Sequence, residues 1–361
     1  MDELYIGVMS GTSLDGVDIA LCKINSGSCE LVFYAEYPFD TNLKNDILTA
    51  INGPTTLKTI GELDTRLGKI YAEYITAFMR HNNLQKKDIS AIGLHGQTLW
   101  HEPDGEFPFS MQLGNANIIT AQTGISVVSD FRQKDIALGG QGAPFAPAFH
   151  KQMFSKLNRN IAVVNIGGIA NLSILGNQLL GYDTGAGNVL MDFWISKKKG
   201  LTYDKNGEWA RSGHVSAELL DTMLRDPYFS KKAPKSTGRE YFNEKWIEKQ
   251  LEEFGYVIDK DVQATLLEFT AVTIANEVKK SSVELLLVCG GGAKNGALME
   301  KLRREFKDIE VSISDYYGLN GDFMEAMAFA WLAYKRINKE KVELSSVTGA
   351  RENSVLGCIY E

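Results

Sequence analysis

Two pairs of apolar segments, each joined by a short glycine-bearing link, most restrict the folds open to this chain. Residues 5–9 and 19–22 are separated by only about nine residues, too few for a helical crossover, so we expect an antiparallel hairpin. Residues 161–165 and 172–175 flank a second link that carries Gly167 and Gly168. One hairpin lies early in each half of the chain, which predicts two similarly built lobes.

Beyond each hairpin, apolar runs typical of strands alternate with segments of helical periodicity. Such runs occur at residues 91–94, 126–128 and 285–289. Apolar side chains recur at helical spacing within residues 60–82, 190–199, 262–280, 298–306 and 325–336. This alternation is typical of an α/β fold. The polar and basic stretches 197–199 and 230–239 are expected to be solvated loops.

The composition excludes several classes of function. With 361 residues, 44% apolar and 23% charged, the chain can bury a large core, and its length suggests two domains with a small-molecule site between them. Asp and Glu outnumber Lys and Arg by 45 to 38, which argues against non-specific binding to nucleic acid or anionic membranes. Scattered cysteines, no signal-like N-terminus and no membrane-length apolar run predict a cytoplasmic enzyme.

The link of the first hairpin is suited to anion binding. Ser10, Thr12 and Ser13 carry hydroxyls that can donate to phosphate oxygens, and the small residues around them leave backbone N–H groups accessible. Asp15 and Asp18 stand beside them. An ordinary tight hairpin is the alternative, but it would require fewer hydroxyls and carboxylates.

Two further glycine segments could contribute to a nucleotide site. Gly167 and Gly168 repeat the hairpin link, so that two such loops facing one another could hold a nucleoside triphosphate. Residues 290–296 follow a buried strand and precede a helix, a turn that a flat ligand could approach closely. As a dinucleotide fingerprint this turn is imperfect, because its third glycine, Gly296, comes one position late; an NAD-dependent dehydrogenase is the corresponding alternative. The P-loop, nucleophile-elbow and zinc-helix motifs are absent from the sequence.

Three polar positions are candidates for chemistry. Asp183, between the second hairpin and a helix, could act as a general base, although an Asx-turn or a helix cap would use the same residue type. His95 begins a polar segment with Gln97 and Thr98, and a lone histidine is as often structural. Arg132 could form a bidentate pair with a substrate carboxylate; a salt bridge to Asp130 or Asp135 is its alternative.

Together these segments resemble those of the anhydro-N-acetylmuramic acid kinase family, and the resemblance covers essentially the whole chain. The first segment is highly specific to that family, whereas the glycine loops alone would match many proteins. The segments, in family order, are residues 9–18, 95–98, 130–132, 139–144, 165–171, 183–185, 235–240, 289–295, 325–330 and 347–351.

The resemblance implies a two-lobed actin-like ATPase fold, with ribonuclease H-like lobes and a nucleotide cleft. Residues 1–125 would form the first lobe and residues 126–324 the second, with residues 325–361 returning to the first. The implied reaction converts ATP, water and 1,6-anhydro-N-acetylmuramic acid into ADP and N-acetylmuramic acid 6-phosphate, in peptidoglycan recycling. It also implies a homodimer. An actin-like or Hsp70-like assembly or chaperone protein is the alternative from another class.

The resemblance also assigns roles to residues. Asp183 would activate the water that attacks C1, and Glu325 would help to position it. Gln97, Thr98 and Arg132 would bind the sugar. Mg²⁺ should accompany ATP, and because Met9 replaces the first-strand aspartate of the wider superfamily, Asp15, Asp18 and Asp183 are the candidates to orient it, with Asp18 preferred. The nucleotide would be held by Gly11, Thr12, Ser13, Leu14, Asp15, Gly16, Val17, Asp18, Gly167, Gly168, Gly290, Gly291, Gly292 and Asn295.

Overall fold

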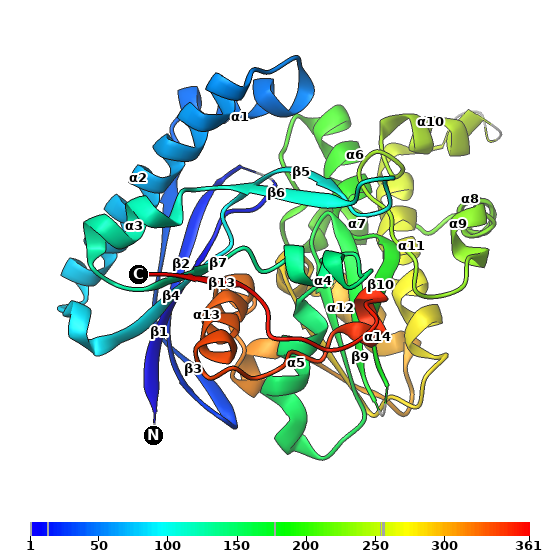
Figure 1. Cartoon of the computed structure of the whole chain (residues 1–361). Coiled ribbons are helices and arrows are strands. Elements are labelled where there is room, and N and C mark those ends of the chain that lie inside the picture. The colour runs from blue at the N-terminus through cyan, green and yellow to red at the C-terminus, as the bar shows by residue number, and fades with distance from the viewer. Residues whose placement is uncertain (1, 13, 177, 253, 255–256) are drawn as a thin grey trace. The chain divides into compact units, whose positions relative to one another are not determined.

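The chain divides into two compact units, whose helices and strands Figure 1 shows. A computed structural model describes residues 2–12, 14–176, 178–252, 254 and 257–361. Unit 1 comprises Met1–Met153 and Phe323–Glu361, and unit 2 comprises Phe154–Asp322. Each unit has its own sheet and its own helices.

The sheet of unit 1 begins with an antiparallel meander and then adds parallel strands. Hairpin β1–β2 has the predicted antiparallel pairing, β3 joins β2, and β4 and β7 extend the other side in parallel. The strands in spatial order are β13 (Cys358–Tyr360), β7 (Val127–Ser129), β4 (Ile89–Leu94), β1 (Glu3–Met9), β2 (Gly16–Asn25) and β3 (Ser28–Pro38). A separate ribbon pairs β5 (Gln97–Glu102) with β6 (Phe109–Leu113). The helices are α1 (Thr41–Asn52), α2 (Leu57–His81), α3 (Ala116–Thr123), α4 (Gln133–Ala137), α5 (Ala146–Phe154), α13 (Met324–Ile337) and α14 (Ser345–Thr348).

The sheet of unit 2 repeats this plan. Strands β8, β9 and β10 form the antiparallel meander, and β11 and β12 are added in parallel beside β8. The spatial order is β10 (Leu179–Ala186), β9 (Ile169–Leu175), β8 (Ile161–Ile166), β11 (Leu285–Cys289) and β12 (Glu310–Ile313). The helices are α6 (Val189–Lys199), α7 (Glu208–Arg211), α8 (Ala217–Leu224), α9 (Pro227–Ser230), α10 (Glu244–Glu252), α11 (Asp259–Val278) and α12 (Gly296–Glu305). The shared order confirms the prediction of two similarly built ribonuclease H-like α/β units.

In unit 1, α13 packs on β1, β2 and β4 at very short range. A Cβ on Gly7 would stand 1.8 Å from the carbonyl oxygen of Ala326, and one on Gly93 would stand 2.0 Å from that of Phe329. Only glycine permits this approach. The other face of the sheet packs on α2, whose Leu67, Tyr71 and Phe78 are buried in the same apolar cluster as Ile6 and Val8.

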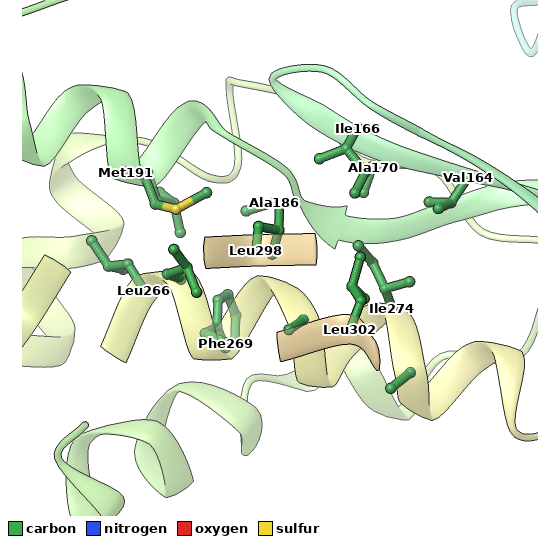
Figure 2. Packing of buried hydrophobic residues seen from close by; sticks show 14 of the residues in the cluster. Val164, Ile166, Ala170, Ala186, Met191, Leu266, Phe269, Ile274, Leu298 and Leu302 are labelled. Carbon is green, nitrogen blue, oxygen red and sulfur yellow. The ribbon is translucent and has the colours of Figure 1, made fainter. Parts of the chain in front are cut away.

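In unit 2, the sheet and helices α6 to α12 contribute to one apolar core, part of which Figure 2 shows. Helix α11 is buried along most of its length, so its apolar residues are not confined to one stripe. The core side chains labelled in Figure 2 are Val164, Ile166, Ala170, Ala186, Met191, Leu266, Phe269, Ile274, Leu298 and Leu302.

Two features differ from the sequence-based expectations. Residues 126–153 were assigned to the second lobe, but β7 pairs with β4 and therefore lies in unit 1. Strand β3 was not anticipated, because most of its side chains are at least partly exposed and give no continuous apolar run.

Candidate functional site

The tip of hairpin β1–β2 combines a buried anchor with exposed polar groups. Leu14 has a φ of 59° in the left-handed region, and its side chain is buried in the core with that of Val17. These two residues therefore offer a ligand only their backbone. Thr12 and Asp15 are exposed at the same tip, so the Thr12 hydroxyl is accessible to a ligand. Ser13, which was expected to join them, lies outside the described residues.

Two other residues of this loop have internal roles that the sequence did not reveal. Ser10 is buried, and its hydroxyl shares a 2.7 Å hydrogen bond with the hydroxyl of Tyr71, so the expectation that Ser10 donates to a phosphate was wrong. A Cβ on Gly16 would stand 2.3 Å from the carbonyl oxygen of Tyr37, so strand packing alone requires this glycine.

Asp18 and Glu325 lie on the same face of unit 1. Asp18 lies between the buried Val17 and Ile19 on β2, so its side chain is on the opposite face of the sheet from theirs. It pairs with Met9 of β1, two positions from the Gly7–Ala20 pair, and α13 covers the face to which a Gly7 side chain would point. Glu325 is exposed in the first turn of α13. Over the described ranges, no cluster of three or more His, Cys, Asp or Glu side chains could hold a metal. Carboxylates such as these are the side chains that bind Mg²⁺ together with phosphate oxygens.

A buried histidine orients Arg132. Nη2 of Arg132 donates to Nε2 of His95 at 2.8 Å, which leaves the proton on Nδ1, where it faces the Ser10 carbonyl oxygen at 3.3 Å. Nη1 of Arg132 donates to the carbonyl oxygen of Gly142 at 2.7 Å. Burial, together with the neighbouring guanidinium, lowers the pKa of His95 to about 3. Burial lowers the pKa of Arg132 to about 10, and the charge of Glu325 opposes this. At neutral pH the pair is thus a neutral imidazole and a cationic guanidinium.

Gln97 and Arg132 each keep one buried polar atom without a partner. Oε1 of Gln97 and Nε of Arg132 have no hydrogen-bond partner among the residues that the structure describes. An unsatisfied buried polar group costs about 1–3 kcal/mol, so a ligand that supplies a hydroxyl and an acceptor oxygen would be favoured here. The hydroxyl of Thr98 already accepts from Gln112 at 3.3 Å. Arg132 forms no ion pair with Asp130 or Asp135 among the described contacts.

In unit 2, the Gly167–Gly168 turn is fixed by the chain that follows β10. The carbonyl oxygen of Gly168 accepts from the N–H groups of Gly187 at 2.9 Å and Val189 at 3.1 Å, and that of Gly167 accepts from Asn188 at 2.8 Å. A Cβ on Gly187 would stand 2.4 Å from the Gly167 oxygen. The turn is therefore rigidly packed against the start of α6.

The second predicted glycine segment meets this turn. Gly290 has a φ of 75°, and its Cβ would stand 2.2 Å from Oδ1 of Asn165. A Cβ on Gly292 would stand 2.4 Å from the side chain of Ile166. The structure thus brings Gly290–Gly292 beside the end of β8. Asn295 caps α12, where its Oδ1 accepts from the Leu298 N–H at 3.2 Å.

Asp183 is held inside β10 by hydrogen bonds to both carboxylate oxygens. Nδ2 of Asn171, its neighbour on β9, donates to Oδ1, and the backbone N–H of Thr237 donates to Oδ2 at 2.9 Å. Burial raises the pKa of Asp183, and the charge of Glu240 adds to the rise. The two hydrogen bonds act in the opposite direction and lower the pKa. Asp183 is neither an Asx-turn residue nor a helix cap, since Asn188 precedes α6. A carboxylate has about four lone-pair sites, so Asp183 can still accept a proton.

The comparisons with known proteins agree over the whole chain. The model of the family described as anhydro-N-acetylmuramic acid kinase matches residues 3–361. The chain belongs to the anhydro-N-acetylmuramic acid kinase family. It is 62% identical to the anhydro-N-acetylmuramic acid kinase of Sulfurimonas denitrificans, with all of both chains covered, and 55% identical to that of Sulfurovum sp. strain NBC37-1, with 99% of each covered.

Among solved structures, this member of the anhydro-N-acetylmuramic acid kinase family is similar to the activator of 2-hydroxyisocaproyl-CoA dehydratase from Clostridium difficile with bound ADPNP. The identity is 13%, the TM-score is 0.46, and 93% of this chain and 96% of that chain are covered. Among the described helices, none is both long enough and apolar enough to cross a membrane.

Sequence reasoning about this kinase missed the surroundings of Asp183. The stretch 230–239 was expected to be a solvated loop, but the Lys235 side chain is only 2% exposed and pairs with Glu277 at 2.7 Å. The guanidinium of Arg239 lies 3.2 Å from where a Cβ of Gly168 would stand. A lysine in a polar and basic stretch carries no local sign of burial; only the occurrence of residues 235–240 among the family segments pointed to them.

Proposed function

We propose that this chain uses ATP and water to convert 1,6-anhydro-N-acetylmuramic acid into N-acetylmuramic acid 6-phosphate and ADP, in peptidoglycan recycling. The observation that carries the proposal is the family match over residues 3–361. No comparison favours an assembly or chaperone protein over this kinase. A cytoplasmic location and a homodimer stay predictions.

The reaction requires one base. A water oxygen attacks C1, the C1–O6 bond breaks, O6 bonds to the γ-phosphorus, and the bond from that phosphorus to the ADP oxygen breaks. Glycosidic hydrolysis usually employs a second carboxyl group to protonate the leaving oxygen. Here the phosphorus captures that oxygen, so only the proton of the water needs an acceptor.

Asp183 is the proposed base. Its two hydrogen bonds fix the direction of the carboxylate, and burial raises its pKa, which strengthens it as a proton acceptor. The exposed Glu325, at the start of α13, is proposed to position the water.

The β1–β2 loop is proposed to bind the phosphates through Gly11, Thr12, Asp15 and Gly16 and the backbone of its buried residues. Asp18 is the proposed Mg²⁺ ligand; Mg²⁺ would neutralise phosphate charge during the transfer. The turns at Gly167–Gly168 and Gly290–Gly292 are proposed to contact the nucleotide by their backbone.

Gln97 and Arg132 are proposed to bind the sugar. Their unpartnered buried atoms, an acceptor and a donor, complement a hydroxyl or amide N–H and a carboxylate. The lactyl and N-acetyl groups of the substrate supply these groups. Thr98 is proposed to have a smaller part, because Gln112 already donates to its hydroxyl.

The test is a stoichiometric assay. The protein is incubated with ATP, Mg²⁺ and 1,6-anhydro-N-acetylmuramic acid, and ADP and sugar phosphate are measured by chromatography and mass spectrometry. We expect equal amounts of the two products, and ADP release should depend on the sugar. Absence of sugar phosphate would overturn the proposal.

A further inference from the structure

We propose that the buried Lys235–Glu277 ion pair positions Asp183, which makes Glu277, on α11, a positioning residue for the reaction. The proposal rests on the role of Asp183 as the base in the proposed function. It also accounts for residues 235–240, to which the sequence analysis assigned no role.

The pair lies deep in unit 2. Nζ of Lys235 is 2.7 Å from Oε1 of Glu277, and the two side chains are 2% and 4% exposed. The same Nζ lies 4.8 Å from the centre of the Tyr228 ring. Tyr228 in turn donates its hydroxyl to the carbonyl oxygen of Asp183 at 2.7 Å. The lysine is therefore fixed against a residue that itself contacts the Asp183 backbone.

The backbone around Lys235 holds Asp183 at two points. β10 is an edge strand of its sheet, so its outer N–H groups have no neighbouring strand. The carbonyl oxygen of Lys235 accepts the Asp183 N–H at 2.9 Å, and two residues later the Thr237 N–H donates to the Asp183 carboxylate at 2.9 Å. Displacement of Lys235 would loosen both contacts together.

The ionic character of the pair explains why Lys235 stays in place. A buried ammonium is strongly unfavourable unless a partner neutralises it, so loss of the Glu277 charge would drive Lys235 towards solvent. Glu277 also accepts from Lys280 at 2.8 Å, but Lys280 is 58% exposed and none of its described contacts reach Asp183. Lys280 thus provides a matched control on the same carboxylate.

The first experiment compares Glu277→Gln with Lys280→Met in the full chain. For Glu277→Gln we expect kcat to fall by about tenfold to a hundredfold, because small misplacements of a catalytic group have effects of this size. KM for ATP and for the sugar should stay within about twofold, since substrate binding is not altered. Lys280→Met should leave kcat and both KM values within about twofold. Unchanged kcat in Glu277→Gln would overturn the proposal.

A second variant separates positioning from loss of fold. Lys235→Met/Glu277→Leu removes both charges and keeps apolar volume, so its melting temperature should recover towards that of the wild type. Its kcat should stay low, because a flexible methionine without a donor does not fix the backbone of residues 235–237. If kcat recovers fully with the melting temperature, the pair is only structural and the proposal fails.

Amide exchange measured by NMR tests the geometry without turnover. In Glu277→Gln the N–H groups of Asp183 and Thr237 should exchange about tenfold faster or more, and in Lys280→Met they should not. If the wild type fails to convert the sugar, the proposed function is wrong, and this exchange result alone then decides whether the pair holds Asp183. Equal protection of both amides in wild type and Glu277→Gln would contradict the positioning role.

Discussion

The two units share one strand order but differ at the tips of their first hairpins. At the tip in unit 1, Leu14 is buried while Thr12 and Asp15 face solvent. In unit 2 the corresponding tip is only Gly167–Gly168, and its carbonyl oxygens are occupied by N–H groups of residues 187–189. One topology thus exposes a hydroxyl and a carboxylate at one tip and gives a rigid support at the other.

The two units also differ in the charged groups that they bury. Unit 1 places a neutral His95 against a cationic Arg132, an arrangement suited to anionic ligands. Unit 2 places Asp183 among donors, next to a buried Lys235–Glu277 pair. The proposed reaction uses both kinds of site, since it needs a base as well as groups that bind phosphate and a sugar acid.

The largest expected effect is on the base in unit 2. Asp183→Asn should lower kcat by about a thousandfold or more, because general bases contribute about 10²–10⁴-fold. Binding of ATP, measured by calorimetry, should change little. Asp192→Asn, on α6, is the matched control and should retain near-normal kcat; near-normal kcat in Asp183→Asn would show that another group is the base.

The next effect concerns the packing of unit 1. Gly7→Ala should lower the free energy of unfolding by about 3 kcal/mol, since its Cβ would stand 1.8 Å from the Ala326 oxygen and α13 must move. Gly61→Ala, where a Cβ would meet nothing within 4 Å in helix α2, should stabilise by about 0.5–1 kcal/mol. Urea unfolding measures both; a tolerated Gly7→Ala would contradict the close packing of α13.

The two hairpins could be predicted from the sequence, whereas the buried contacts between distant residues could not. Short links between apolar runs predicted both hairpins, because such links leave one pairing possible. The burial of Ser10 and Lys235 could not be predicted, since each depends on a distant partner, Tyr71 and Glu277. The residue types at Asp183 and Arg132 suggested chemistry, but one hydrogen bond of each comes from a residue 54 or 37 positions away, Thr237 and His95.

A smaller effect is expected at the sugar-binding residues of unit 1. Arg132→Lys should raise KM for the sugar by about tenfold or more, because lysine lacks the Nε donor and hydrogen bonds to charged groups contribute about 1.5–3 kcal/mol. KM for ATP should change little. Thr98→Val is the control and should have a minor effect, since the Thr98 hydroxyl is already engaged; equal losses in both variants would argue against the assignment.

The smallest effect is on pH dependence, and its sign should differ between the units. In unit 1, burial lowers the pKa of His150 to about 3, below the roughly 6.5 of an unfolded histidine, so its contribution to stability is lost as pH falls below about 6.5. In unit 2, burial raises the pKa of Asp192 to about 6, opposed by Arg239, so its contribution grows as pH falls through that value.

Melting curves at pH 7 and pH 5 test this contrast. His150→Gln should weaken the loss of stability on acidification. Asp192→Asn should stabilise more at pH 7 than at pH 5, because the wild type carries the buried charge at pH 7 and has largely lost it at pH 5. For Asp192, which is partly solvated, the difference should be below about 1 kcal/mol. Parallel pH dependence in wild type and both variants would contradict the assigned pKa directions.

The most direct test of the central claim follows the oxygen of water through one turnover. The enzyme is given ATP, Mg²⁺ and the anhydro-sugar in H₂¹⁸O, and the products are analysed by mass spectrometry. The account predicts one ¹⁸O atom in the hydroxyl at C1 of the sugar 6-phosphate and none in its phosphate, with one ADP formed per sugar. Label in the phosphate, or ADP formed without an opened sugar, would contradict it.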